Sequence, residues 1–324
     1  MRRTILFLTT ITTLCSTMAS LGAQDRTVGL INGYGNFDRY CVRAVPESGI
    51  IGGRTKYLYE FYGDGDTTCT REPFVSPDDY LWRTNNVLAI VAGVVKTNAT
   101  VFPEERDGGY CARIETHVET VKALGIVNMD VVCQGAMFIG RLFEPIRDTK
   151  DPQSKVQYGI RFNGRPKALV FDYKADVGHT TYRGTGFSKL KELDYPDYPE
   201  VVVMLQKRWE DESGQIHALR VGTGVEKITE NVSEWRNGHR LKIKYGDITS
   251  EPDFYENMDL NNDPDRAFYA VNSVGKKVIV SEDGWADAAE EPNYIIINFY
   301  SSCHKAFYGG VGNILWIDNV RLEM

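Results

Sequence analysis

An acidic segment with one large aromatic ring, EDGWAD at residues 282–287, combines side chains that suit a polyhydroxylated ligand. A tryptophan ring can stack on the apolar face of a sugar, and neighbouring carboxylates can accept hydrogen bonds from hydroxyl groups. The segment lies between two predicted strands, and loops on a rigid sandwich often carry binding residues. We therefore predict that Trp285, Asp283 and Asp287 bind a sugar. The competing interpretation is that Trp285 folds back and caps the core.

Two further tryptophans have polar neighbours. Trp82 is followed by an amide at Asn85, and Trp209 ends the run VVVMLQKRW at residues 201–209, next to Arg208. Trp82 could equally plug the end of the core, and either face of the second run could line a groove. Trp82, Asn85, Trp209 and Arg208 complete the predicted ligand-binding set. Trp316 stands in a strongly apolar run and is predicted to be a core residue.

Motifs of nucleophilic and zinc catalysis are missing from the sequence. There is no GxSxG, SxxK or HExxH, no two cysteines form a CxxC pair, and the five histidines never occur at ligand spacing. We therefore predict no catalytic residue and no zinc site.

A pair of carboxylates is the enzymatic alternative. Glycoside hydrolysis needs two such groups across the scissile bond, at separations of roughly 5 to 9.5 Å that depend on the mechanism. Acids are abundant, and nothing in the sequence distinguishes two of them; the candidates are Glu210, Asp211, Glu212, Glu282, Asp283, Asp287, Glu290 and Glu291. A glycoside hydrolase therefore stays open as the second interpretation.

Residues 259–263, DLNND, resemble the start of a calcium-binding loop because alternate residues offer hard oxygen ligands. However, Pro264 occupies the position that requires glycine, and Ala270 the position of the bidentate glutamate. We favour an ordinary polar loop and predict no cofactor. If an ion binds there, we expect a structural calcium ion.

The strand that best anchors a fold prediction is KALVFDYK at residues 167–174. Positions 169, 171 and 173 are apolar, whereas positions 172 and 174 carry an acid and a base, and this period of two indicates a half-buried strand. Residues 201–209 and 216–221 are predicted to form a hairpin. The continuous apolar run at residues 87–95 predicts either one buried strand or a short buried helix.

Roughly a dozen such strands, separated by turns rich in Gly, Pro and Asp, predict an all-β protein, an antiparallel β-sandwich of jelly-roll type. We assign residues 54–324 to this domain. Residues 24–53 lack clear periodicity and are expected to form a loosely packed N-terminal extension.

The first 23 residues indicate export. Arg2 and Arg3 precede the apolar run Ile5–Leu14, and small residues lead to a cleavage site after Ala23, as in a secretory signal peptide. No apolar run approaches the roughly 20 residues that a membrane span requires. We expect the protein in the periplasm, on the outer-membrane surface or outside the cell. Lipidation at Cys15 is a less favoured alternative because no small residue precedes it.

The cysteines indicate which disulfides are possible, and the net charge indicates which binding partners are disfavoured. Five cysteines follow the predicted cleavage site, an odd number at irregular spacing, so we expect buried free thiols with at most one bridge, although an oxidising compartment allows one or two; the pairing is left open among Cys41, Cys69, Cys111, Cys133 and Cys303. The net charge is −7 and becomes more negative once Arg2 and Arg3 are removed. Such a surface disfavours nucleic acid and anionic membranes and leaves neutral partners open.

Three segments together resemble a known family: GIRFNGRPKALVFDYKAD, VVVMLQKRWED and the terminal YSSCHKAFYGGVGNILWIDNVRL. The chain from Ser48 to Met324 is similar to the putative carbohydrate metabolism domain of secreted proteins in glycan-degrading Gram-negative bacteria. This resemblance implies a jelly-roll sandwich similar to carbohydrate-binding modules, and it assigns no catalytic residue. We expect a secreted, non-catalytic protein that captures a glycan. A glycoside hydrolase and a structural or adhesive protein that binds another protein are the alternatives. The sugar, the shape of the site and the oligomeric state are left open.

Overall fold

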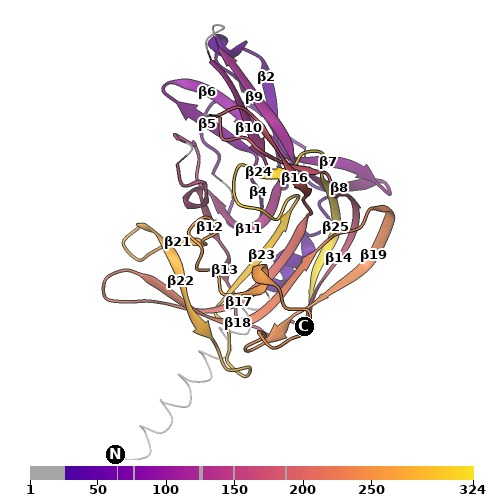
Figure 1. Cartoon of the computed structure of the whole chain (residues 1–324), viewed down its shortest axis with the longest axis vertical. Coiled ribbons are helices and arrows are strands. Elements are labelled where there is room, and N and C mark those ends of the chain that lie inside the picture. The colour runs from indigo at the N-terminus through magenta and orange to yellow at the C-terminus, as the bar shows by residue number, and fades with distance from the viewer. Residues whose placement is uncertain (1–25, 64, 76, 124–126, 149, 187) are drawn as a thin grey trace, which may run out of the picture.

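The structure is a computed structural model that describes residues 26–63, 65–75, 77–123, 127–148, 150–186 and 188–324. Almost all regular structure in these ranges is β, and Figure 1 shows a large sandwich beneath a smaller β lobe. The predicted all-β sandwich is confirmed. The predicted signal peptide lies outside the described residues, and no helix within them is long and apolar enough to cross a membrane.

One layer of the sandwich is a ten-stranded sheet centred on the hairpin of β17 (Glu200–Glu210) and β18 (Ile216–Lys227). The predicted hairpin is thus confirmed, with Trp209 opposite His217. The order is β12 (Val156–Tyr158), β11 (Ala136–Leu142), β23 (Tyr294–Tyr300), β17, β18, β22 (Lys277–Trp285) and β21 (Tyr269–Val271). Three short strands pair at its edges and ends: β4 (Trp82–Thr84), β13 (Ile160–Arg161) and β20 (Lys244–Tyr245). Strands β18 and β22 run parallel.

The second layer is an antiparallel five-stranded sheet, in the order β19 (Val232–Lys242), β14 (Ala168–Asp176), β25 (Ile314–Glu323), β8 (Gly109–Glu115) and β7 (Val101–Arg106). Alternate residues of the two sheets face each other and form the main core. These include Leu169, Phe171, Tyr173, Leu315 and Ile317 from one layer and Val201, Val203, Leu205, Ile297 and Phe299 from the other. Complete burial of each such side chain contributes roughly 1.5–3 kcal/mol, so the alternation read from the sequence fixes which face turns inward.

The outer face of β14 departs from the prediction. Val170 and Asp172 are each only 6% exposed, so the strand is buried on both sides. Arg106, at the end of β7, donates to Asp172 (3.0 Å) and to Asp318 (2.7 Å). Trp316 was expected in the core but lies on this outer face, where its Nε1 donates to Glu104 (2.8 Å). A sequence pattern with a period of two indicates which residues share a face of the strand. It does not indicate that a charged residue from another strand covers the polar face.

The N-terminal region is packed, which makes the expected loose extension wrong. Residues 26–33 are helical, and Ile31 and Phe37 are buried in the sandwich core. Strand β1 (Cys41–Pro46) pairs with β2 (Thr55–Glu60) and with β3 (Thr67–Cys69). The buried residues of this region lie in one short helix, one short strand and irregular chain, so the sequence shows no long periodic pattern there.

The predicted single strand at residues 87–95 is instead a hairpin of β5 (Val87–Val91) and β6 (Val94–Asn98). Ala92 and Gly93 both have positive φ (49° and 79°), as the two central residues of a type I′ hairpin turn require. The remaining strands are β9 (His117–Ala123), β10 (Val127–Cys133), β15 (Thr180–Arg183), β16 (Lys191–Pro196) and β24 (Tyr308–Gly310). The described residues also form three short 3₁₀ helices, η1 (Gly49–Ile51), η2 (Pro152–Lys155) and η3 (Glu256–Met258).

Trp82 gives a test of this packing. Its ring is 2% exposed, lies 5.4 Å from the ring of Phe37, and donates through Nε1 to the carbonyl of Ile31 (3.3 Å). We predict that Trp82→Ala lowers the free energy of unfolding by about 3–5 kcal/mol in denaturant titrations. Trp209→Ala is the control, because Trp209 is 43% exposed and surface changes usually stay within about 0.5 kcal/mol. Equal losses in the two variants would contradict the packing described.

Candidate functional site

The outer face of the ten-stranded sheet, turned away from the main core, carries a cleft of about 280 Å³. Its floor comes from the paired strands β17 and β23, which contribute Glu200, Val202, Met204, Asn298 and Tyr300. One wall is the segment of residues 255–268, which we call the wall segment. The lining is completed by Gln134, Gln153, Ser302, Cys303 and His304. Amides and carboxylates therefore dominate the lining, with Tyr300 and Phe268 as its rings.

Asn298 is the most unusual group in the floor. It is fully buried between Val202 and Phe138, and neither its side-chain oxygen nor its side-chain nitrogen has a hydrogen-bond partner among the described residues. A buried polar group without a hydrogen-bond partner lowers the stability of the protein by about 1–3 kcal/mol, and such groups are rare in native proteins. A ligand that offers both a donor and an acceptor would satisfy both atoms.

Glu200 is a second buried polar group in the floor. The carboxylate is 2% exposed and accepts hydrogen bonds from Asn257 Nδ2 (2.5 Å) and the hydroxyl of Tyr255 (3.3 Å). Arg266 Nη2 lies 3.7 Å from the other carboxylate oxygen. Burial raises the pKa of Glu200, and the bond from Asn257 and the charge of Arg266 only partly oppose this effect. The cleft thus contains a carboxyl group that holds its proton more tightly than an exposed one.

The wall segment is attached to the sheet by a buried ion pair between Arg220 on β18 and Glu282 on β22. Both side chains are fully buried, and Arg220 Nε donates to Glu282 at 2.7 Å. Glu282 also accepts from Gln206 Nε2 (2.5 Å) and from the backbone N–H of Asn261 (2.6 Å). Arg220 donates in addition to the carbonyl oxygen of Asp259 (3.3 Å). The wall segment therefore has a defined position over the sheet.

Residues 259–263, the calcium-like segment, belong to this wall. The carboxylates of Asp259 and Asp263 accept from the backbone N–H groups of Leu260 (2.7 Å) and Asp265 (2.9 Å). Asn261 donates through its side chain to the carbonyl of Arg266 (2.8 Å). These are the contacts of a polar loop, and a structural calcium ion stays a prediction.

A second cavity of about 260 Å³ adjoins the cleft and shares Gln134, Gln153 and Tyr300 with it. Its lining is mainly apolar and includes Val87, Phe138, Leu142, Ile146 and Phe307. We call these two adjoining cavities the groove; the lining of the first is mainly polar and that of the second mainly apolar.

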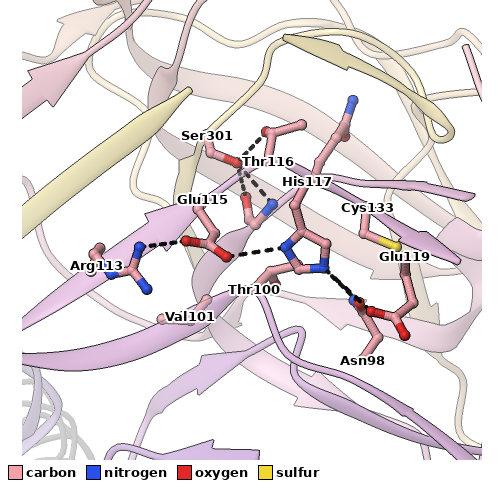
Figure 2. A network of polar contacts seen from close by, with 12 residues as sticks. Asn98, Thr100, Val101, Arg113, Glu115, Thr116, His117, Glu119, Cys133 and Ser301 are labelled. Carbon is pink, nitrogen blue, oxygen red and sulfur yellow. Dashed lines mark hydrogen bonds and ion pairs between the residues drawn. The ribbon is translucent and has the colours of Figure 1, made fainter. Parts of the chain in front are cut away.

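A polar network supports the loop that follows β23. Figure 2 shows Thr116 and Ser301 in contact, with their hydroxyl oxygens 2.7 Å apart, and Glu115 between Arg113 and His117. Burial opposes ionisation of Glu115, but the hydrogen bond with His117 and the charge of Arg113 outweigh it and lower its pKa. Ser301 also accepts from the backbone N–H of Gly135 (2.8 Å). The network joins β8 to the loop that carries Cys303 and His304.

Trp82, Arg208 and Asn85 are not available to a ligand in the way the sequence suggested. Trp82 is a core residue, as its competing interpretation held. Arg208 is buried, where its guanidinium donates to Gln206 (2.7 Å) and to the carbonyl of Tyr158 (3.1 Å), and burial lowers its pKa to about 10. Asn85 lines the second cavity, but its oxygen accepts from Ala136 N–H (2.9 Å) and its nitrogen donates to the carbonyl of Gln134 (2.6 Å).

Trp209 and Asp283 do come together, through a residue that the sequence analysis missed. His217 stacks on the exposed ring of Trp209, with centroids 5.5 Å apart and planes 14° apart. Its ring nitrogens lie 2.8 Å from Asp283 and 3.3 Å from Asp211. Partial burial lowers the pKa of His217, but the hydrogen bonds to Asp283 and Asp211 outweigh it and raise the pKa overall. This exposed patch does not line the cleft.

Trp285 and Asp287 lie apart from the cleft as well. The predicted loop at residues 282–287 is wrong in part, because β22 pairs with β18 as far as Trp285, with a register shift next to Ala218. The ring of Trp285 is half-buried, 5.6 Å from the guanidinium carbon of Arg220. Asp287 is exposed and accepts from the backbone N–H of Ala289 (2.8 Å).

The groups that form the cleft had one signal in the sequence. Asn298 is a polar side chain inside NYIIINFY, residues 293–300, where its neighbours are apolar or aromatic. An amide in a strand buried on both faces needs a partner, so this position marks the floor. Glu200 carries no comparable mark, because only its burial makes this acid unusual, and the acids of the wall segment are ordinary exposed residues.

Comparison with known proteins gives one family match. A family model described as "Putative carbohydrate metabolism domain" matches residues 59–323. No curated protein matches the chain.

Two solved structures with some likeness are described as putative glycoside hydrolases. One, from Bacteroides thetaiotaomicron VPI-5482, has 17% identity and a TM-score of 0.42, and the match covers 69% of this chain but only 56% of that one. The other, from Bacteroides vulgatus ATCC 8482, has 17% identity and a TM-score of 0.47 and covers 86% and 98% of the two chains. A carbohydrate-binding module specific for non-crystalline cellulose, CBM28, has 11% identity and a TM-score of 0.25, with 70% and 83% covered.

The ion pair beneath the wall segment gives a prediction on stability. Glu282→Leu leaves the Arg220 charge buried without its carboxylate, so we expect the free energy of unfolding to fall by about 3–5 kcal/mol. Glu323→Leu is the matched control, because Glu323 pairs with Arg240 at 2.7 Å on the surface, where such a pair contributes less than about 1 kcal/mol. Urea titration of both variants measures the difference. A Glu282 variant as stable as the Glu323 variant would show that the pair does not hold the wall segment.

Proposed function

The chain belongs to the family of the putative carbohydrate metabolism domain, and on this premise we propose that it binds a carbohydrate in the cleft beside the wall segment. The resemblance seen from Ser48 to Met324 is confirmed by the family match over residues 59–323. A carbohydrate-related role follows from the family, and the cleft is our assignment of where the carbohydrate binds.

The unpaired amide of Asn298 is the observation that carries this proposal. A sugar hydroxyl both donates and accepts, so one or two hydroxyl groups can pair with both side-chain atoms of Asn298. Carboxylates and amides around the cleft offer further partners, and Tyr300 and Phe268 offer apolar ring surface. The sugar and the cleft are chemically complementary, because the hydroxyl groups would supply the hydrogen-bond donor and acceptor that Asn298 lacks.

The groove favours an oligosaccharide over a single sugar. The cleft and the apolar cavity meet at Gln134, Gln153 and Tyr300, so a ligand longer than one residue can continue from the polar end into the apolar end. Export through the signal peptide of residues 1–23 would place this groove where extracellular or periplasmic glycans occur. We propose capture without catalysis as the function.

Glycoside hydrolysis is the second candidate, and Glu200 is the observation that favours it. A buried carboxyl with a raised pKa is suited to donate a proton to a leaving group. Glu256, Asp259 and Asp263 line the same cleft and could supply the second carboxylate. The adhesive alternative has no comparable feature among the described residues in its favour and stays a prediction.

Substitution of Asn298 tests the binding proposal. We predict that Asn298→Ala weakens binding of an oligosaccharide identified on a glycan array by about 10-fold or more, measured by calorimetry, because paired hydrogen bonds are lost. The free energy of unfolding should stay the same or rise, because the amide has no partner in the part of the chain that the structure describes. Asn36→Ala, at an exposed amide outside the cleft, is the control. Unchanged affinity in Asn298→Ala would place the sugar elsewhere.

Reducing-sugar assays separate capture from hydrolysis. We predict that the mature protein releases no reducing ends from the glycan it binds. Release that Glu200→Gln abolishes and Glu323→Gln preserves would instead establish hydrolysis. In that case the acid must be protonated, so the rate should fall as pH rises through the raised pKa of Glu200.

A further inference from the structure

Three side chains with metal-binding atoms converge at the end of the cleft. The carboxylate of Asp197, the thiol of Cys303 and the imidazole of His304 have their ligand atoms within 4.8 Å of one another. Asp197 Oδ1 lies 3.3 Å from Cys303 Sγ and 3.6 Å from His304 Nε2. Asp197 comes just before β17, and the other two follow β23, so the pairing of these strands brings the three together.

These separations match a tetrahedral metal site. Zinc lies about 2.0–2.3 Å from carboxylate oxygen, imidazole nitrogen and thiolate sulfur, so tetrahedral ligand atoms are roughly 3.3–3.8 Å apart. The separations of Asp197 Oδ1 from Cys303 Sγ and from His304 Nε2 fall in this range, and the third pair of atoms lies within 4.8 Å. We propose that Asp197, Cys303 and His304 bind a divalent transition-metal ion of the zinc type.

The burial of Asp197 points independently to a cation. Its carboxylate is fully buried, and within the described ranges its only ion-pair partner is His304, which is charged only when protonated. Backbone N–H groups of Tyr198 (2.7 Å), Cys303 (3.3 Å) and Gly310 (2.9 Å) donate to the two carboxylate oxygens. Buried carboxylates are normally paired with a cation or coordinate a metal. A divalent ion would compensate this charge.

Metal binding here is an exchange of one proton for the ion. In the protein alone, the Cys303 thiol donates to Asp197, and burial raises its pKa to about 12. A divalent ion forms a bond to sulfur, and the thiol proton leaves to solvent, so no oxidant or reductant is needed. A bound cation favours the thiolate strongly enough to reverse the effect of burial.

The site faces the proposed binding cleft. Cys303 and His304 both line it, and three protein ligands leave a further coordination position for water or a hydroxyl group. Sequence motifs could not reveal the site, because Asp197 stands 106 positions before Cys303. Our exclusion of zinc chemistry rested on local spacing, which this arrangement bypasses.

Cobalt(II) is the probe for this site. Mature protein, freed of metal with a chelator, should bind one equivalent of Co²⁺ with a near-ultraviolet band from thiolate coordination and visible bands of a four-coordinate ion. Added Zn²⁺ should remove these bands by displacement. Absence of any thiolate band at saturating Co²⁺ would overturn the proposal.

Variants identify the ligands. Cys303→Ser should abolish the thiolate band, and His304→Asn should weaken Co²⁺ binding by at least about 10-fold. Cys69→Ser, at an exposed free thiol, and His239→Asn, on the opposite sheet, should leave the spectrum unchanged. A band that survives Cys303→Ser or disappears in Cys69→Ser would refute the assignment. Because the readout needs no carbohydrate, it stands or falls separately from glycan binding.

Discussion

The ion pair between Arg220 and Glu282 is the interaction on which the outer face of the large sheet depends. Burial of these two opposite charges has a large desolvation cost. Their mutual attraction and the further hydrogen bonds that each side chain makes offset this cost. The partners in these bonds include Asn261 and Asp259 of the wall segment. Displacement of the segment would remove the Asn261 N–H from Glu282 and the Asp259 carbonyl from Arg220, two hydrogen bonds to buried charges. A polar cleft is thus kept at fixed geometry on a sheet whose other face is an apolar core.

The sequence predicted the sandwich where alternation decides packing. The alternation at residues 167–174 identified β14, and the polar turn between residues 209 and 216 identified the central hairpin. It failed where a face is covered by charged groups, as Arg106 covers Asp172. It also failed where a single residue, such as Phe37, reaches the core from irregular chain. A periodic pattern in the sequence indicates burial only where it recurs at regular positions. A single ion pair or a single core residue produces no such pattern.

The candidate site was less predictable than the fold, and for a related reason. Aromatic and acidic residue types directed attention to Trp82 and Trp285, whose rings are buried or half-buried against the protein itself. The cleft depends on Asn298 and Glu200, which are common residue types made unusual by burial. Burial of a polar group arises from strands distant in sequence, so residue type and spacing do not reveal it. Of the predicted ligand-binding residues, Trp209, Asp283 and Asp287 are exposed, and the first two meet at His217.

A crystal structure of the mature protein with its best oligosaccharide from a glycan array tests the central claim most directly. Our account predicts a sugar in the cleft between β17, β23 and the wall segment, with hydroxyl groups within hydrogen-bonding distance of both side-chain atoms of Asn298. A sugar stacked on Trp209 and His217, with the cleft free of ligand, would contradict it.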